Sequence, residues 1–255
     1  MQLDGLNVIV TGAAQGIGKA TALAMAKAGA NVSCIDIKTD GVAAVAAQVK
    51  ALGRKSLAIT ADLGSVTEID RMVADTVKAF GHIDALVNNA GVTRRAYIMD
   101  LTEEDWDRIH RVNAKGVFFC LQRVAREMIP RRQGRIINIA SIAGLAGSSE
   151  DIQFIAYGTS KGAVVNFTRT LAGEWGEHGI TVNAIAPGFF PSKMTKGVLE
   201  THGADNLAAH APLKRLGDDD DLKGAALLFA SAAGKHITGQ ILAIDGGVSA
   251  VISGG

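Results

Sequence analysis

The sequence has few cysteines, almost no net charge and no long apolar run, and each shortage excludes a class of protein. Its two cysteines, Cys34 and Cys120, both lie in apolar segments, which predicts buried thiols in a reducing compartment rather than disulfides or metal ligands. Basic residues exceed acidic ones by only 26 − 25 = 1, so the chain offers no basic surface for nucleic acid or for a membrane. The longest weakly polar run, residues 224–234, is far shorter than the ~20 residues that span a bilayer.

Neither the N-terminus nor the histidines carry a targeting or metal-binding pattern. Residues 1–5 contain an acid and no basic segment, so we expect no signal peptide and a cytoplasmic location. The six histidines are scattered and lack a spacing such as H-x-x-x-H. We therefore predict no catalytic metal.

Short apolar runs alternate with amphipathic stretches along the whole chain. This alternation favours an α/β protein with a doubly wound, Rossmann-like parallel sheet of about seven strands. We expect strands at residues 6–10, 32–35, 57–59, 83–87, 135–140, 180–185 and 240–244. We expect helices at residues 16–28, 41–52, 66–80, 102–129, 156–178 and 218–233, the last with four aspartates at its N-terminus. No linker interrupts the pattern, so residues 1–255 are predicted to form a single domain.

A glycine-rich turn follows the first expected strand and opens the first expected helix. Glycines in this place allow a sharp turn and a close approach to a pyrophosphate, which the free N–H groups of the helix would bind. The alternative is a tight turn without a ligand. A P-loop is excluded because Ala13 and Ala20 replace the glycine and the hydroxyl residue that it needs. The turn residues predicted to contact the cofactor are Gly12, Gln15, Gly16, Ile17 and Gly18.

Asp36 stands at the end of the second expected strand. An acid there accepts hydrogen bonds from the ribose hydroxyls of NAD and repels the 2′-phosphate of NADP. Two like charges at ~4 Å cost on the order of 4 kcal/mol at an effective dielectric near 20. Neither Gln15 nor Ile37 is an arginine that would bind the phosphate, although Lys38 is near. We predict NAD as the cofactor, with Asp36 and Ile37 at its ribose; the alternative is that Asp36 is only a turn residue.

Tyr157 and Lys161 lie four residues apart on one expected helix, so their side chains share a face. An ammonium at ~4 Å would lower the pKa of a phenol by roughly three units, into the range of a general acid–base. By its spacing alone, such a pair is also compatible with a coincidence on the surface.

Further motifs place this pair in a known family. The turn Thr11–Gly18 matches T-G-x-x-x-G-x-G, and residues 88–91 read N-N-A-G. With Asn113, Ser141, Y-x-x-x-K and Pro187-Gly188 in the same order, nearly the whole chain resembles the short-chain dehydrogenase/reductase family. The resemblance implies a catalytic tetrad in which Tyr157 is the acid–base and Ser141 orients the reacting oxygen. In the same tetrad, Lys161 would lower the pKa of Tyr157 and bind the nicotinamide ribose. Asn113 would hold a relay water.

The resemblance also implies further contacts with the cofactor. Asp62 and Leu63 would lie at the adenine, and Pro187 and Gly188 near the nicotinamide. The residues expected to line the rest of the cleft are Asn89, Ala90 and Gly91. Three other roles stay open: Ser141 as a turn residue only, Asn113 as a helix-kink residue, and Asn88 as a link between strands.

The substrate side of the site departs from the family pattern. Ser141 and Tyr157 are 157 − 141 = 16 positions apart, which is more than the family usually has, so the loop at 147–154 should overhang the substrate and bring Ser148 to it. Phe189, Phe190 and Met194 suggest an apolar wall, or alternatively ordinary core packing. We expect a substrate lid at about 189–217, where the pattern is least regular.

These features favour an NAD-dependent dehydrogenase of a secondary alcohol, or reductase of a ketone, with an apolar alkyl or aryl part. The alternative within the family is a 3-oxoacyl-(carrier protein or CoA) reductase, because residues 92–107 resemble that group and Arg131 and Arg132 would suit an acidic carrier. Asp36 and Gly173, which stands where carrier-docking reductases often have arginine, argue against it. A non-catalytic NAD-binding sensor is a third hypothesis. The partner expected is a small-molecule substrate, and the resemblance implies a homotetramer.

Overall fold

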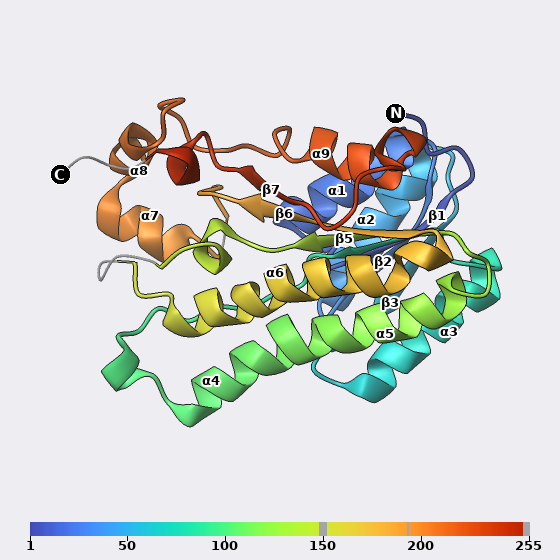
Figure 1. Ribbon diagram of the computed structural model, residues 1–255, viewed down its shortest axis with the longest axis horizontal. Helices are drawn as coiled ribbons and strands as arrows, with labels where there is room; N and C mark the ends of the chain where they lie inside the picture. The colour runs from blue at the N-terminus through green and yellow to red at the C-terminus, as the bar shows by residue number, and fades with distance from the viewer. Residues whose placement is uncertain (148–151, 193, 252–255) are drawn as a thin grey trace.

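The computed structural model describes residues 1–147, 152–192 and 194–251, and its centre is a seven-stranded parallel sheet (Figure 1). Each expected strand is present, with ends within two residues of the prediction, so the α/β fold class is confirmed. The strands are β1 (Asn7–Thr11), β2 (Asn31–Asp36), β3 (Ser56–Thr60), β4 (Ala85–Asn88), β5 (Gly134–Ile139), β6 (Ile180–Pro187) and β7 (Ile241–Ile244).

The order of the strands in the sheet is β3-β2-β1-β4-β5-β6-β7. The direction of winding therefore reverses between β1 and β4, which pair in parallel with Val8 opposite Ala85. Side chains at the carboxyl ends of these two strands border the crevice in which open α/β sheets bind ligands. The predicted cofactor residues of the glycine turn and of N-N-A-G follow these two ends directly.

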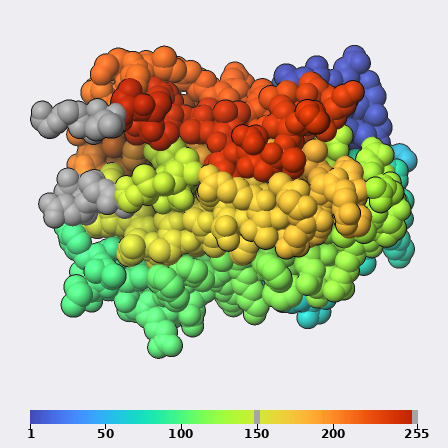
Figure 2. All heavy atoms as spheres, viewed as in Figure 1, coloured from blue at the N-terminus to red at the C-terminus, as the bar shows by residue number. Residues whose placement is uncertain are grey.

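Helices cover both faces of the sheet and bury an apolar core on each. One core contains residues of α1, α2 and α9, such as Met25 and Phe229, and the other contains residues of α3, α5 and α6, such as Met72 and Leu121. The bounds of the helices are α1 (Gly16–Lys27), α2 (Thr39–Ala51), α3 (Val66–Phe80), α4 (Glu103–His110), α5 (Val117–Met128), α6 (Ile155–Trp175), α7 (Lys196–His202), α8 (Ala204–His210) and α9 (Lys223–Ala230). Figure 2 shows α6, in yellow, lying across the middle of one face above the green band of α4 and α5.

The helix expected at 102–129 is not uniform. Between α4 and α5 the chain forms a π-helical segment, Arg111–Gly116. Gly116 packs tightly against the turn that follows β3. A Cβ on Gly116 would lie only 2.5 Å from the carbonyl oxygen of Leu63 in that turn. The wider π-turn carries Asn113 to the inner side of the helix, where it is 0% exposed. The apolar period of the sequence does not distinguish such a segment from an α-helix.

The last expected helix begins later than predicted. Residues 218–221 form a turn before α9, which starts at Lys223. The carboxylate of Asp221 accepts two hydrogen bonds of 2.6 Å from the Arg215 guanidinium and one from the Asp218 amide. The aspartates therefore close a turn instead of occupying the first turn of the helix.

The segment expected to form a lid contains α7 and α8, which lie at the end of the molecule towards which β6 and β7 run (Figure 1). A third, smaller apolar cluster joins them to the start of α6. Its buried members are Phe154, Val198 and Leu207, and Tyr157 packs against it. The lid thus covers the side of α6 that carries the predicted acid–base.

Candidate active site

The structure brings Ser141, Tyr157 and Lys161 together beyond the carboxyl end of β5. Ser141 follows that strand, and its hydroxyl lies near enough to Tyr157 to lower the pKa of the phenol. The ammonium nitrogen of Lys161 lies 5.7 Å from the centroid of the Tyr157 ring and donates a 2.6 Å hydrogen bond to the Ile139 carbonyl. Because Tyr157 and Lys161 are one turn apart in α6, the helix itself sets their relative positions.

The pKa of Tyr157 moves in the opposite direction from the sequence-based prediction. Burial raises it from 10.0 to about 12, and the nearby Ser141 hydroxyl offsets only part of this effect. Burial also lowers the pKa of Lys161 from 10.5 to about 8. Both shifts have one physical cause, because a low-polarity site disfavours the phenolate and the ammonium alike. At neutral pH the pair is therefore a neutral phenol beside an ammonium, which is the state that donates a proton.

Asn113 approaches this cluster from the π-helical segment, and its carboxamide is held on three sides. Its Nδ2 donates to the Val92 carbonyl at 2.8 Å and to the Ser160 hydroxyl at 3.0 Å. Its Oδ1 accepts from the Val92 amide at 2.8 Å. Both amide hydrogens are thus used within the protein, so the predicted relay water would have to bind an oxygen of Asn113.

The glycine turn has the shape that a pyrophosphate site needs. Gly12 adopts a left-handed φ of +65°, and a Cβ at Gly18 would collide with the carbonyl oxygen of Gly12. The side chain of Asn89 braces the turn by donating to the carbonyls of Thr11 and Gly12 at 2.9 and 3.2 Å. The Gln15 side chain accepts a hydrogen bond from Lys38 Nζ at 3.0 Å and makes no capping hydrogen bond with the first turn of α1. The amides of Gly16, Ile17 and Gly18 begin that helix and fit a dinucleotide phosphate.

Asp36 ends β2 beside this turn. Its two carboxylate oxygens accept hydrogen bonds of 3.0 Å from the backbone amides of Ala14 and Lys38. The next residue, Ile37, is 63% exposed. An ordered carboxylate beside an exposed apolar side chain fits a ribose and its base.

The other predicted cofactor residues lie along the same edge of the sheet. The Asp62 carboxylate accepts a 2.8 Å hydrogen bond from the Gly64 amide, and Leu63 is buried. A Cβ on Gly91 would lie 3.3 Å from Asn113 Oδ1 and 3.8 Å from Lys161 Nζ, so the N-N-A-G turn, which includes Ala90, borders the catalytic cluster. Pro187 ends β6, and Gly188 follows it.

The predicted substrate residues separate into different environments. Phe189 packs in the apolar cluster that contains Tyr157, whereas Phe190 is 7% exposed, belongs to the main core and contacts Gly217. Phe190 therefore packs in the core, and because it also lines a separate cavity beside β7, its contact with substrate stays a prediction. Met194 is 39% exposed, and Ser148 lies outside the described residues.

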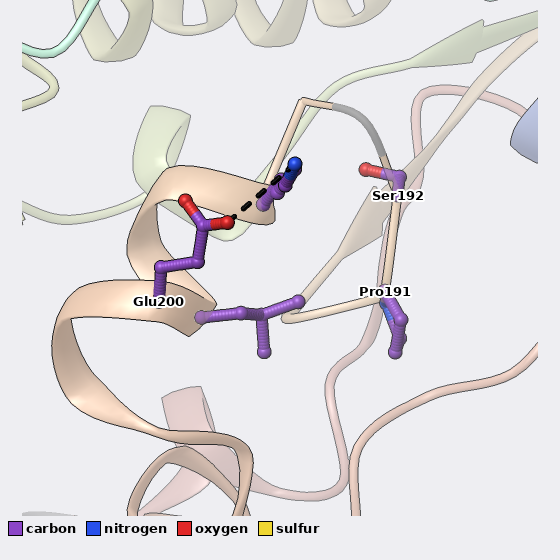
Figure 3. Close-up of a pocket in the computed structure, with 5 residues that line it drawn as sticks. Pro191, Ser192 and Glu200 are labelled. Atoms are coloured by element: carbon purple, nitrogen blue, oxygen red, sulfur yellow. Dashed lines mark ion pairs between the residues drawn. The ribbon is translucent and has the colours of Figure 1, made fainter.

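A cavity of about 420 Å³ opens in the lid (Figure 3). Lys196 and Glu200 form an ion pair of 3.5 Å on α7 at this cavity. Its lining residues are Pro191, Ser192, Lys196, Leu199 and Glu200.

Two glycines that bring the catalytic segments together were missed by the sequence analysis. A Cβ on Gly144 would lie 2.6 Å from the backbone carbon of Lys161, and one on Gly158 would lie 2.8 Å from the Ala143 carbonyl oxygen. The short segment Ile142–Gly144, which follows Ser141, therefore packs directly on α6. The contact joins segments that are distant in sequence, so periodicity does not reveal it.

The two arginines considered for carrier docking differ in their contacts. Arg131 donates to the Ile83 carbonyl and to the Asp84 carboxylate, each at 2.8 Å. Its guanidinium is therefore bound to the two residues that precede β4. Arg132 is exposed and contacts the Glu177 carbonyl.

The fold and this cluster are those of an oxidoreductase that uses a nicotinamide dinucleotide. A family model described as enoyl-(acyl carrier protein) reductase matches residues 12–249. The chain belongs to the short-chain dehydrogenase/reductase family, as its motifs predict.

Named relatives extend the similarity over nearly the full length. The 3-oxoacyl-[acyl-carrier-protein] reductase FabG of Staphylococcus epidermidis is 40% identical over 243 residues, which cover 95% of this chain and 98% of the relative. The (2S)-[(R)-hydroxy(phenyl)methyl]succinyl-CoA dehydrogenase subunit BbsD of Thauera aromatica is 41% identical over 249 residues, 98% of each chain. The structure also resembles a gluconate 5-dehydrogenase from Burkholderia cenocepacia in complex with NADP and tartrate, with a TM-score of 0.93, 34% identity and 98% of both chains covered.

The described residues lack the features of two other classes of site. Among the helices of residues 1–147, 152–192 and 194–251, none combines the length and the apolar character that crossing a membrane requires. The same residues contain no group of three or more histidine, cysteine or acidic side chains placed to hold a metal ion.

Proposed function

We propose that the protein transfers a hydride between a nicotinamide cofactor and carbon 3 of a 3-oxoacyl or 3-hydroxyacyl thioester. The observation that carries the chemistry is the position of the Tyr157 phenol, with the Ser141 hydroxyl near enough to lower its pKa and the Lys161 ammonium 5.7 Å from its ring centroid. The thioester class rests on the relatives, which are by name a 3-oxoacyl-carrier-protein reductase and a dehydrogenase of a phenyl-bearing hydroxyacyl-CoA. These names favour the alternative of the sequence analysis over its main prediction of a general secondary-alcohol dehydrogenase.

In this proposal the chain's own residues orient and protonate the reacting oxygen. Ser141 and Tyr157 each offer a hydroxyl to the carbonyl oxygen at carbon 3, and Tyr157 gives up its proton as charge develops there. The Lys161 ammonium stabilises the phenolate that remains, and Asn113 holds the segment opposite. A bound nicotinamide supplies or accepts the hydride.

We propose NAD rather than NADP as the cofactor. Asp36 carries the argument, because both its oxygens are held by backbone amides and its charge cannot move far from a 2′-phosphate. Lys38, two residues further along the chain, has its Nζ hydrogen-bonded to Gln15 and would offset this repulsion only in part. The gluconate 5-dehydrogenase that binds NADP makes a direct comparison of the two cofactors necessary.

The second candidate is an unesterified secondary alcohol or ketone with an apolar part. It is supported by the apolar cluster that surrounds Tyr157, in which Phe154, Phe189 and Leu199 pack. An alkyl or aryl group beside the reacting carbon would fit this surface. The same observation is compatible with an aryl-substituted thioester.

The deciding experiment follows NADH and NADPH absorbance with three groups of substrate. These are 3-oxoacyl-CoA thioesters of increasing chain length, the same acyl groups on a carrier protein, and ketones and secondary alcohols without a thioester. A kcat/KM on thioesters at least about ten times that on the matched ketones supports the proposal. Turnover of ketones alone supports the second candidate. Tight NAD binding without any turnover would support the sensor hypothesis and overturn both.

Assembly and location remain predictions. A homotetramer is expected from the family resemblance, and light scattering on the purified protein tests it, since a monomer at micromolar concentration contradicts it. A cytoplasmic location follows only from the composition of the sequence.

A further inference from the structure

Ser160 stands immediately before Lys161 in α6, and its hydroxyl connects the two segments that carry Asn113 and Tyr157. We propose that Ser160 is a positioning residue for the reaction, acting through Asn113. This inference rests on the proposed function, because it concerns the same site. Ser160 makes no contact with a reacting atom in the proposal.

The Ser160 hydroxyl both accepts and donates a hydrogen bond. The oxygen accepts a hydrogen bond of 3.0 Å from Asn113 Nδ2 and donates one of 2.7 Å to the Tyr157 carbonyl. Both Ser160 and Asn113 are 0% exposed. A hydroxyl is one of the few side-chain groups that donates and accepts at once, so an apolar residue would break both links.

The position of the Asn113 carboxamide depends on this hydroxyl. Its other hydrogen bonds both go to one residue, Val92, which follows the N-N-A-G turn. Ser160 therefore links the carboxamide to α6. Without it, one buried N–H group of Asn113 loses its acceptor, and the carboxamide is expected to rotate in search of another.

A movement of Asn113 would also displace Gly91, which lies between Asn113 and the Lys161 ammonium. The Cβ position of Gly91 lies 3.3 Å from Asn113 Oδ1 and 3.8 Å from Lys161 Nζ, so the three are packed together. A shift of the Val92 segment would thus displace the turn that borders both the ammonium and the predicted cofactor cleft. Such a displacement is expected to slow the chemical step more than it weakens cofactor binding, because Asp36, at the ribose end of the predicted cofactor site, is held by contacts outside this turn.

The same helix contains a matched control. Thr168 is also 0% exposed, accepts a hydrogen bond of 3.0 Å from an asparagine, Asn138 Nδ2, and donates one of 2.9 Å to the Val164 carbonyl. Its hydroxyl has the same burial and the same pattern of bonds as that of Ser160. Its partner lies in β5 and makes no contact with Asn113 among those described.

The first test compares kcat and the KM for the cofactor in Ser160→Ala, Ser160→Thr and Thr168→Val. We expect Ser160→Ala to lower kcat about ten-fold with the cofactor KM changed by less than about twofold. Ser160→Thr, which keeps the hydroxyl, should recover most of the loss, and Thr168→Val should keep kcat within about twofold of the unsubstituted protein. Equal losses of kcat in Ser160→Ala and Thr168→Val would overturn the proposal, as would an equal rise in cofactor KM.

The second test is a double-mutant cycle between Ser160 and Asn113. In an Asn113→Ala background, Ser160→Ala should change kcat by less than about twofold, because the group through which it acts is gone. Independent, multiplicative losses would overturn the proposal. If Ser160→Ala does not fold, Ser160→Cys, which is close in size and only a weak donor, takes its place in both tests.

Unfolding measurements separate this inference from the proposed function. The same cycle is measured by denaturant midpoint, which needs no turnover. Coupling in unfolding without activity in the unsubstituted protein would mean that the proposed function is wrong although the hydrogen bond exists. Activity with full additivity in both cycles would mean that the proposed function holds and the role of Ser160 does not.

Discussion

The carboxylate of Asp36 accepts the backbone N–H of Ala14 at 3.0 Å, which fixes the end of β2 against the turn that follows β1. Two segments that are more than twenty residues apart in sequence are thereby joined at the crevice of the sheet. The charge at this position cannot swing away from a ligand without losing two backbone hydrogen bonds. We therefore expect cofactor choice to depend on this side chain.

Replacement of that carboxylate should change the cofactor preference. We expect Asp36→Ser to raise the ratio of kcat/KM for NADP to that for NAD by at least about ten-fold, because a repulsion of up to ~4 kcal/mol at the 2′-phosphate is removed. Steady-state kinetics with both cofactors measure it. Asp40→Ser is the matched control, since Asp40 is an exposed acid in the first turn of α2, and its ratio should not move. An unchanged ratio in Asp36→Ser contradicts the proposed role at the ribose.

Removal of the Tyr157 hydroxyl should abolish proton transfer and leave the cofactor site intact. We expect Tyr157→Phe to lower kcat by about 10²–10⁴, the usual contribution of a positioned general acid, with NADH affinity in a fluorescence titration unchanged. The chain has one other tyrosine, Tyr97, which is exposed. Tyr97→Phe should retain full kcat. Near-normal turnover in Tyr157→Phe would show that another group moves the proton.

The buried ammonium of Lys161 should make stability depend on pH. The pKa of Lys161 is about 8 in the folded chain and 10.5 when unperturbed, so between these values the unfolded chain binds more protons. The free energy of unfolding attributable to Lys161 therefore rises with pH from about 8 to 10.5 and is constant below this window. In the Lys161→Met variant, the free energy of unfolding should no longer show this rise.

The two buried thiols change the free energy of unfolding with pH in the opposite direction from Lys161. The experiment therefore has to separate their contribution from that of Lys161. Burial raises the pKa of Cys34 to about 11 and that of Cys120 to about 12, so their contribution to stability falls as pH rises above 9. The free energy of unfolding is thus compared between the unsubstituted protein and Lys161→Met at each pH. Parallel curves between pH 8 and 9 would contradict the assignment of a depressed pKa to Lys161.

A side chain at Gly144 should separate the Ser141 segment from α6. Because a Cβ there would lie 2.6 Å from the Lys161 backbone, we expect Gly144→Ala to destabilise the fold by about 1–3 kcal/mol, the usual effect of overpacking, and to lower kcat. Gly173→Ala is the control within α6, where a Cβ meets nothing within 4 Å, and it should stabilise the helix by roughly 0.5–1 kcal/mol. Chemical unfolding of both variants measures the difference, and equal stability in the two would contradict the close packing.

Some features of the site were predictable because the information is local. The strand β1, the glycine turn and the helix α1 follow one another directly in the chain. The spacing of the glycines can therefore be recognised from neighbouring residues alone. Tyr157 and Lys161 share a face because any α-helix places residues four apart on one side. Family motifs added Asn113 and Ser141, and the structure brings all four to one end of the sheet.

Other features depend on contacts between distant segments. The π-helical turn that buries Asn113, the core position of Phe190 and the turn that the 218–221 aspartates form with Arg215 have no local signal. The bridge from Asn113 through Ser160 to Tyr157 joins two helices whose facing sides are unknown until they pack.

The amino-acid sequence by itself determined the order of the elements, the place of the glycine turn and the identity of the four candidate catalytic residues, because periodicity and motif spacing are properties of neighbouring residues. Only the tertiary structure decided the direction of the Tyr157 pKa shift. That direction depends on how much water the packed lid and helices leave around a phenol, and the balance between burial and hydrogen bonding is set by residues far from Tyr157 in the chain.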